Sequence, residues 1–154
     1  MSLGIALAGG GLKGVAYIGV FKALEELNIK VDYISGTSSG SLFAAMYAMG
    51  FTVQEMRDRT LANYKMLTNV SKKPFAKAAV TLAAKGVAEI DGFMPSENIA
   101  ELIRKVSEDK YIKRMNETIV PLAITTVDTI STKECIFLTR ECDKKYDDID
   151  YFVR

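Results

Sequence analysis

Histidine is absent from the sequence, and this absence excludes several kinds of site within the chain. Without histidine there is no Ser-His-Asp triad, no Cys-His pair and no His-ligated zinc or haem. Tryptophan is absent as well, so an aromatic stacking platform would have to use Tyr or Phe. The two cysteines, Cys135 and Cys142, form no CxxC pair, which favours free thiols in a reducing compartment over a metal centre.

Long hydrophobic runs are missing too. Lys22, Gly50 and Lys85 interrupt the most apolar stretches well before the ~20 residues that a transmembrane helix needs. The apolar N-terminus has no basic segment before it, as a signal peptide would. We therefore expect a cytoplasmic protein, at most peripheral to a membrane.

The sequence has almost no excess of charge of either sign, because 20 Lys and Arg residues are balanced by 19 Asp and Glu residues. A net charge of +1 gives no general attraction to nucleic acid or anionic lipid. The short basic clusters at 72–73 and 110–114 have no interleaved aromatics, and the acidic residues lack the spacing of a calcium loop. We interpret both as solvated surface and expect no nucleic-acid partner. The acidic residues are Asp143, Asp147, Asp148 and Asp150.

What the 154 residues do contain is a strand-helix-strand-helix opening. Apolar patterning predicts strands over 5–8, 31–35, 119–127 and 135–139. It predicts helices over 12–27, 39–49, 52–64, 74–85 and 95–107, the last with Ile99, Leu102, Ile103 and Val106 on one face. Gly50 and the Thr52–Glu55 capping-box spacing mark helix ends. This order predicts one α/β domain with a mainly parallel sheet.

A glycine-rich loop lies between the first strand and the first helix, in the sequence Gly9-Gly-Gly-Leu-Lys-Gly14. Consecutive glycines permit backbone conformations in which several N–H groups converge on one point. The following helix adds its own unsatisfied N–H groups and the positive end of its dipole. Such a loop suits an anion or a developing oxyanion.

The same glycines fit a second interpretation. Gly9, Gly11 and Gly14 match the dinucleotide-binding fingerprint, and Asp32 follows at about the distance of its acidic residue. A dinucleotide-binding module is therefore an alternative. A third possibility is a fragment that folds without catalysing a reaction.

A second motif favours catalysis. Gly36-Thr37-Ser38-Ser39-Gly40 is a G-x-S-x-G sequence between a predicted strand and a predicted helix, the context of a nucleophile elbow. The turn would hold Ser38 in a strained conformation with its hydroxyl above the sheet. Both loops should open at the carboxyl edge of the parallel strands. Ser38 would attack an acyl carbonyl while the glycine-loop N–H groups bind the resulting oxyanion.

These two stretches, residues 4–27 and 32–41, resemble the opening of bacterial patatin-like phospholipases. The resemblance implies a three-layer α/β/α sandwich with a mainly parallel central sheet, and a lipid acyl hydrolase without metal or nucleotide cofactor. It implies Ser38 as nucleophile and an oxyanion hole formed by the loop, with Lys13 as its basic residue. The loop residues are Gly9, Gly10, Gly11 and Leu12; Lys13, Gly14, Gly36, Thr37, Ser39 and Gly40 support the two motifs.

The family's second catalytic residue is an aspartate in an Asp-Gly-Gly/Ala motif, so no histidine is required. The one Asp-Gly pair, Asp91-Gly92, precedes the last two predicted strands and is in the wrong chain order. Asp128 is explained by a turn at a strand end. We therefore expect residues 1–154 to be the N-terminal part of a single patatin-like domain. The dyad aspartate is then expected beyond Arg154, and we expect the 154-residue chain alone to be inactive.

Three further features have structural interpretations. Met46, Met49 and Met56 are expected in the core rather than in an acyl pocket. The alanine-rich stretch over 74–87 is expected to pack as an ordinary helix, with an interfacial helix meeting lipid as the alternative. An uncovered sheet edge could let the chain associate with itself.

Overall fold

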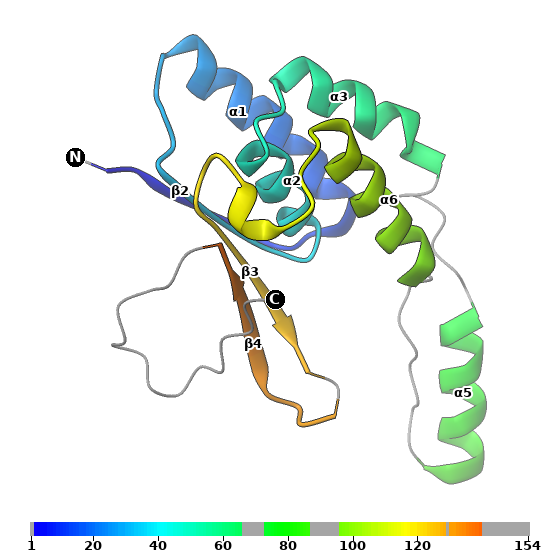
Figure 1. The fold of residues 1–154 in the computed structure, drawn as a ribbon. Helices are drawn as coiled ribbons and strands as arrows, with labels where there is room; N and C mark the ends of the chain where they lie inside the picture. Colours follow the sequence, from blue (N-terminus) through cyan, green and yellow to red (C-terminus); the bar gives the residue numbers. More distant parts are fainter. Residues whose placement is uncertain (1, 66–72, 87–95, 129, 140–154) are drawn as a thin grey trace.

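The computed structural model describes residues 2–65, 73–86, 96–128 and 130–139. Helices and strands alternate at the start, a helical middle follows, and a hairpin ends the described part (Figure 1). In chain order the elements are β1 (Gly4–Leu7), the 3-10 helix η1 (Gly11–Val15), α1 (Ala16–Glu26), β2 (Tyr33–Thr37), α2 (Ser39–Ala48), α3 (Val53–Ala62), α5 (Lys73–Lys85), α6 (Ser96–Asp109), the 3-10 helix η2 (Met115–Glu117), β3 (Leu122–Val127) and β4 (Glu134–Leu138).

The sheet has the order β1-β2-β3-β4, in which the first three strands are parallel and β4 is antiparallel to β3. The prediction of a mainly parallel sheet is confirmed. Strand β2 begins two residues later than predicted and extends to Thr37, because Gly36 pairs with Leu7 and Thr37 pairs with Thr125. This extension carries the strand directly into the Ser38 turn.

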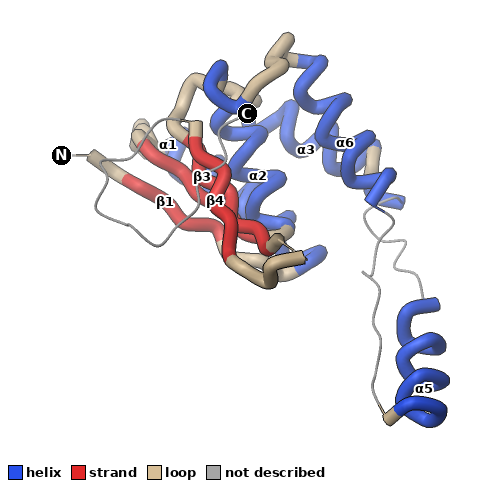
Figure 2. Tube along the Cα trace, turned by 60° about the horizontal axis from the view of Figure 1, so that its bottom comes forward, coloured by secondary structure: helices blue, strands red, loops and turns tan. Residues whose placement is uncertain are grey.

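Helices α1, α2, α3 and α6 lie over one face of the sheet, as Figure 2 shows, and α2 contacts all three parallel strands. Ile34 and Gly36 point to this face and are buried, whereas Tyr33 and Thr37 point to the opposite face and are exposed. The parallel strands β1, β2 and β3 follow one another in sheet order, so crossovers of the usual right hand place their helices on the same face. The α/β class is thus confirmed, and the second helical layer of the sandwich stays a prediction.

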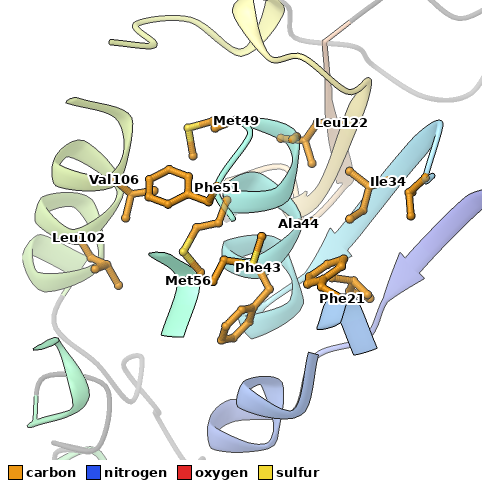
Figure 3. Packing of buried hydrophobic residues seen from close by; sticks show 14 residues of the cluster. Phe21, Ile34, Phe43, Ala44, Met49, Phe51, Met56, Leu102, Val106 and Leu122 are labelled. Carbon is orange, nitrogen blue, oxygen red and sulfur yellow. The ribbon is translucent and has the colours of Figure 1, made fainter. Parts of the chain in front are cut away.

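The core lies between the sheet and these helices (Figure 3). Met46, Met49 and Met56 are all buried, as predicted, and the ring of Phe21 on α1 stacks on that of Tyr47 with centroids 4.7 Å apart. Helix α6 contributes Leu102 and Val106, but Ile103 is 50% exposed. The face that carries Leu102, Ile103 and Val106 is therefore only partly buried.

Local capping signals place several helix ends where the sequence predicts them. Gly50 follows α2 with φ of +79°. Before α3, the Thr52 hydroxyl accepts a hydrogen bond from the Glu55 N–H, and the Glu55 carboxylate accepts one from the Thr52 N–H. This reciprocal pair is the predicted capping box.

Helix α5 stands away from the rest of the described chain in both views (Figures 1 and 2). Its apolar residues Val80 and Leu82 are 66% and 56% exposed, whereas Thr81 is buried. The predicted packing role is therefore not seen for Val80 and Leu82. On β4, Cys135 is a buried free thiol, as expected. Cys142, Asp91 and the acidic residues after position 142 lie outside the described residues.

Candidate active site

The G-x-S-x-G sequence forms a sharp turn between β2 and α2. Ser38 caps the amino end of α2 with φ of 54° and ψ of −125°. A positive φ is uncommon outside glycine and strains the backbone. The strained turn predicted at Ser38 is therefore present at the carboxyl end of a parallel strand, the edge at which α/β proteins bind ligands.

Two glycines of the motif allow this turn because chain segments cross them closely. A Cβ on Gly40 would lie 2.3 Å from the carbonyl oxygen of Leu7 and 2.7 Å from that of Ala8. A Cβ on Gly36 would lie 2.6 Å from the carbonyl group of Gly40. Any side chain at either position would push strand and helix apart.

The glycine-rich loop passes directly beside Ser38. A Cβ on Gly9 would lie 3.0 Å from the Cβ of Ser38 and 3.7 Å from its Oγ. Gly10 has an extended φ of 173°, and Gly11 has a φ of +57° that favours glycine. The structure thus brings together the two motifs that the sequence analysis singled out.

The loop continues into η1, where the Lys13 N–H donates to the Gly10 carbonyl at 3.2 Å. The first N–H groups of a helix, here those of Gly11 and Leu12, have no intrahelical acceptor. The side chains of Leu12 and Lys13 are exposed. Gly14 is buried, and a Cβ there would lie 3.0 Å from Ser39 Oγ, a buried hydroxyl without a hydrogen-bond partner among the described residues.

Two residues that the sequence analysis did not single out also lie at this edge. The hydroxyls of Thr37 and Thr125 are hydrogen-bonded at 2.6 Å across β2 and β3. The hydroxyl of Tyr17 on α1 donates to the carbonyl of Ala8 at 2.8 Å. Spacing offered one signal for Tyr17, which follows Gly14 by three residues and therefore lies on the same side of the helical stretch.

Asp32 lies at the opposite end of the sheet from the glycine-rich loop. It precedes β2, its N–H donates to the Leu3 carbonyl at 2.8 Å, and its carboxylate accepts from the Leu3 N–H at 2.8 Å. The acidic residue of a dinucleotide site must reach a ribose bound near the glycines. The geometry therefore removes Asp32 from the dinucleotide interpretation.

Asp128 follows β3 and belongs to the hairpin turn, as the sequence suggested. Its carboxylate accepts hydrogen bonds from the Ser131 hydroxyl and from the N–H groups of Ile130 and Ser131. The Ser131 hydroxyl, followed by these N–H groups, holds the pKa of Asp128 below its usual value. A carboxylate stabilised in this way is a weak base, and its hydrogen bonds to described residues all lie within the turn.

In the part of the chain that the structure describes, no three Cys, Asp or Glu side chains gather as a possible metal site. Within the same ranges, no helix is both long and apolar enough to cross a membrane.

Comparison with known proteins identifies the family. A family model for patatin-like phospholipases matches residues 5–152. The chain belongs to this family. The resemblance seen in the two glycine motifs is thus confirmed.

Curated relatives match short stretches of this patatin-like chain. The lysophospholipase nte1 of Aspergillus fumigatus is 50% identical over 58 residues, which are 38% of this chain and 4% of that protein. The lysophospholipase NTE1 of Coccidioides immitis is 57% identical over 47 residues, 30% of this chain and 3% of that protein. The chain therefore spans a small fraction of the relatives it matches.

Among solved structures, the type III effector protein ExoU superposes with a TM-score of 0.56 at 17% sequence identity. The alignment covers 97% of this chain and 37% of the ExoU chain. At this identity the likeness shows the fold alone. The patatin-like fold class expected from the sequence is confirmed.

Proposed function

We propose that this patatin-like chain carries the nucleophile and the oxyanion hole of a serine acyl hydrolase that acts on lipid esters. The observation that carries the proposal is the conformation of Ser38. Its φ of 54° and ψ of −125° hold it at the start of α2, beside Gly9. A serine held in a sharp strand-to-helix turn presents its hydroxyl to a substrate above the sheet edge.

In the proposed reaction, Ser38 Oγ attacks the acyl carbonyl carbon of a lipid ester. The hydroxyl proton passes to a base, and the new C–O bond turns the carbonyl oxygen into an anion. Collapse of this intermediate expels the alkoxide, which takes up the proton and leaves as the alcohol; water then hydrolyses the acyl-serine and releases the fatty acid. The backbone N–H groups of Gly9, Gly10, Gly11 and Leu12 are the proposed donors to the anion. Removing one such donor in other enzymes lowers the rate by about 10²–10³-fold.

The exposed Lys13 is proposed to favour an anionic headgroup at the same edge or to support the loop. Its N–H closes the turn onto Gly10, so its backbone is fixed at the start of η1, and its side chain is exposed. Thr37, Ser39 and the flanking glycines Gly14, Gly36 and Gly40 are proposed to support the two turns rather than to react.

The proton acceptor for Ser38 is proposed to be an aspartate outside residues 1–154. Asp32 lies at the wrong end of the sheet, and Asp128 is held by the hairpin turn. Thr125 pairs with Thr37, so Asp128 begins about 10 Å further along the strand direction. Neither carboxylate is placed as a base for Ser38, which supports a dyad completed elsewhere.

The test compares Ser38→Ala with Ser107→Ala in the full-length protein, using lysophospholipid and p-nitrophenyl ester hydrolysis. Ser107 lies on α6 and its hydroxyl donates to the Ile103 carbonyl of the same helix. We expect Ser38→Ala to lower kcat at least ~10³-fold and Ser107→Ala to leave it unchanged. Hydrolysis at the wild-type rate in Ser38→Ala would contradict the proposal. The isolated 154-residue chain should turn over substrate far more slowly than the full-length protein.

A cytoplasmic location with transient contact at a membrane surface is also proposed. The support is the exposed apolar surface of α5, which stands on the side toward which the arrow of β3 points in Figure 1.

Self-association is proposed through β1, which pairs only with β2 among the described strands. Sedimentation over a range of concentrations tests that second point, and a monomer at high concentration contradicts it.

A further inference from the structure

One side chain outside both glycine motifs holds the loop that leads to the proposed oxyanion hole. Tyr17 lies in the first turn of α1, and its hydroxyl donates to the Ala8 carbonyl at 2.8 Å. Ala8 is the residue immediately before Gly9. The loop is therefore tied to the helix that follows it at the point where β1 ends.

This hydrogen bond fixes more than the carbonyl. The Ala8 carbonyl and the Gly9 N–H belong to one planar trans peptide, in which the two bonds point in opposite directions. A donor that fixes the direction of the Ala8 oxygen therefore fixes the direction of the Gly9 N–H. Gly9, on one side of this peptide, has no side chain to restrain the rotation of the peptide plane.

Packing against α2 holds the Tyr17 ring in place. Its ring meets the ring of Phe43 edge-on, with centroids 6.1 Å apart, and Phe43 is buried on α2. The other side of the same carbonyl is closed by Gly40, where a Cβ would come within 2.7 Å of the Ala8 oxygen. The Ala8–Gly9 peptide is thus held between Tyr17 on α1 and the amino end of α2, which begins after Ser38.

We propose that Tyr17 is a positioning residue that orients the Gly9 N–H toward the oxyanion formed at Ser38. The proposal rests on the proposed function of Ser38. It assigns to the tyrosine hydroxyl no proton transfer and no contact with the substrate. Its effect is confined to the direction of one backbone donor.

The test is Tyr17→Phe in the full-length protein, which removes the hydroxyl and keeps the ring against Phe43. Tyr47→Phe is the matched control. The Tyr47 hydroxyl accepts a hydrogen bond from the Val31 N–H at 3.4 Å, and its ring stacks on Phe21, away from the glycine-rich loop. Each variant thus loses one tyrosine hydroxyl that contacts the backbone.

Three measurements are made on both variants. We expect Tyr17→Phe to lower kcat about 10-fold, the effect of one lost hydrogen bond, with KM nearly unchanged. The rate at which a fluorophosphonate labels Ser38 should fall by a similar factor. In that reaction Ser38 Oγ forms a bond to phosphorus, fluoride leaves and the hydroxyl proton passes to a base. Hydrogen exchange at the amides of Gly9 to Gly11 should accelerate in Tyr17→Phe and not in Tyr47→Phe.

Unchanged kcat and labelling rate in Tyr17→Phe would overturn the proposal, and so would unchanged amide exchange. An equal loss of kcat in the two variants would also overturn it, because it would mark a general loss of stability. Failure of the proposed function has a different signature, namely equal hydrolysis by wild type and Ser38→Ala. In that case the exchange of the Gly9 amide still decides whether Tyr17 orients this peptide.

Discussion

At the scale of single residues, the conformation of Ser38 depends on the absence of Cβ atoms at Gly36 and Gly40. A non-glycine residue in a sparsely populated backbone region costs on the order of 1–3 kcal/mol. The surrounding structure must therefore determine the turn, and Gly36 and Gly40 do so by letting β2, α2 and the end of β1 approach closely. The absence of two Cβ atoms allows the packing that holds Ser38 in place.

This packing argument is tested by replacing Gly40 with alanine and comparing the effect with that of the same change at Gly19, a glycine within helix α1. We expect Gly40→Ala to lower the free energy of unfolding by more than about 4 kcal/mol or to prevent folding, because its Cβ would lie 2.3 Å from the Leu7 oxygen. Gly19 is the control, since it lies in α1 with open space where a Cβ would be. Gly19→Ala should stabilise the protein by about 1 kcal/mol. Urea denaturation of both variants measures the difference, and equal effects would contradict the packing argument.

The sequence predicts the Ser38 turn but not the contacts of Tyr17 and Thr125. The turn follows from five consecutive residues between a strand and a helix, so its signal is local. Thr37 and Thr125 are 88 positions apart and meet only because β2 and β3 pair in one particular register. A single sequence contains no record of that register. The proposed dyad aspartate is a harder case, because the Asp-Gly pair of the sequence, Asp91-Gly92, lies outside the described residues.

At the scale of elements, the amino end of α3 is joined to the end of α6 through Glu55. Its carboxylate closes the capping box with Thr52 and also accepts from the ammonium group of Lys110, with both Oε–Nζ distances at 2.9 Å. The same ammonium group lies over the ring of Phe51, 4.7 Å from its centroid. These contacts lower the pKa of Glu55 from 4.5 to about 2. The hydrogen bond from Lys110 contributes most, and the hydrogen bond from the Thr52 N–H contributes next.

Glu55→Gln separates charge from capping, because glutamine can still accept from the Thr52 N–H. Nearly half of the Glu55 side chain is exposed, so solvent screening limits the expected loss of stability at pH 7 to about 1 kcal/mol. The folded pKa is below the unfolded one, so this contribution is complete above pH 4.5 and disappears as the pH falls toward 2. Urea denaturation at pH 7 and pH 3 should therefore show a smaller difference at pH 3.

The control for this prediction is Glu26→Gln, which removes an exposed carboxylate 3.7 Å from Lys22 on α1. It should change stability by less than about 0.5 kcal/mol at either pH. A Glu55→Gln difference that does not depend on pH would show that the charge of Glu55 contributes nothing.

The ends of elements were predictable where a side chain or a glycine acts locally, as at Thr52 and Gly50. Faces of helices were less predictable. The apolar spacing of α6 places Leu102, Ile103 and Val106 on one face. Leu102 and Val106 are buried on the side of Phe51 (Figure 3), whereas Ile103 is half exposed. How wide a face a helix buries depends on its partner, which periodicity does not contain.

At the scale of the whole molecule, the described helices that pack on the sheet lie on one side of it, and the opposite face is lined by exposed Tyr33, Thr37 and Val127. The edge with Ser38 lies between these faces. Helix α5 is the described element that stands apart from both layers (Figures 1 and 2). It therefore offers apolar surface that the core of the described chain does not use.

The proposed membrane contact of α5 is tested with vesicles that contain anionic phospholipid. Val80 and Leu82 are 66% and 56% exposed, and inserting one large aliphatic side chain into the acyl boundary contributes up to about 1.5–3 kcal/mol. We expect Leu82→Glu to lower the vesicle-bound fraction of the protein about 10-fold in a sedimentation assay. Val80→Glu should act in the same direction.

Val20→Glu is the control, because Val20 is an exposed aliphatic residue on α1. It should leave vesicle binding unchanged. Hydrolysis of a soluble short-chain ester should be the same in all three variants, since none of the residues belongs to the Ser38 site. Equal binding by Leu82→Glu and wild type would show that α5 does not contact the membrane. A loss of short-chain hydrolysis would instead place α5 against the substrate itself.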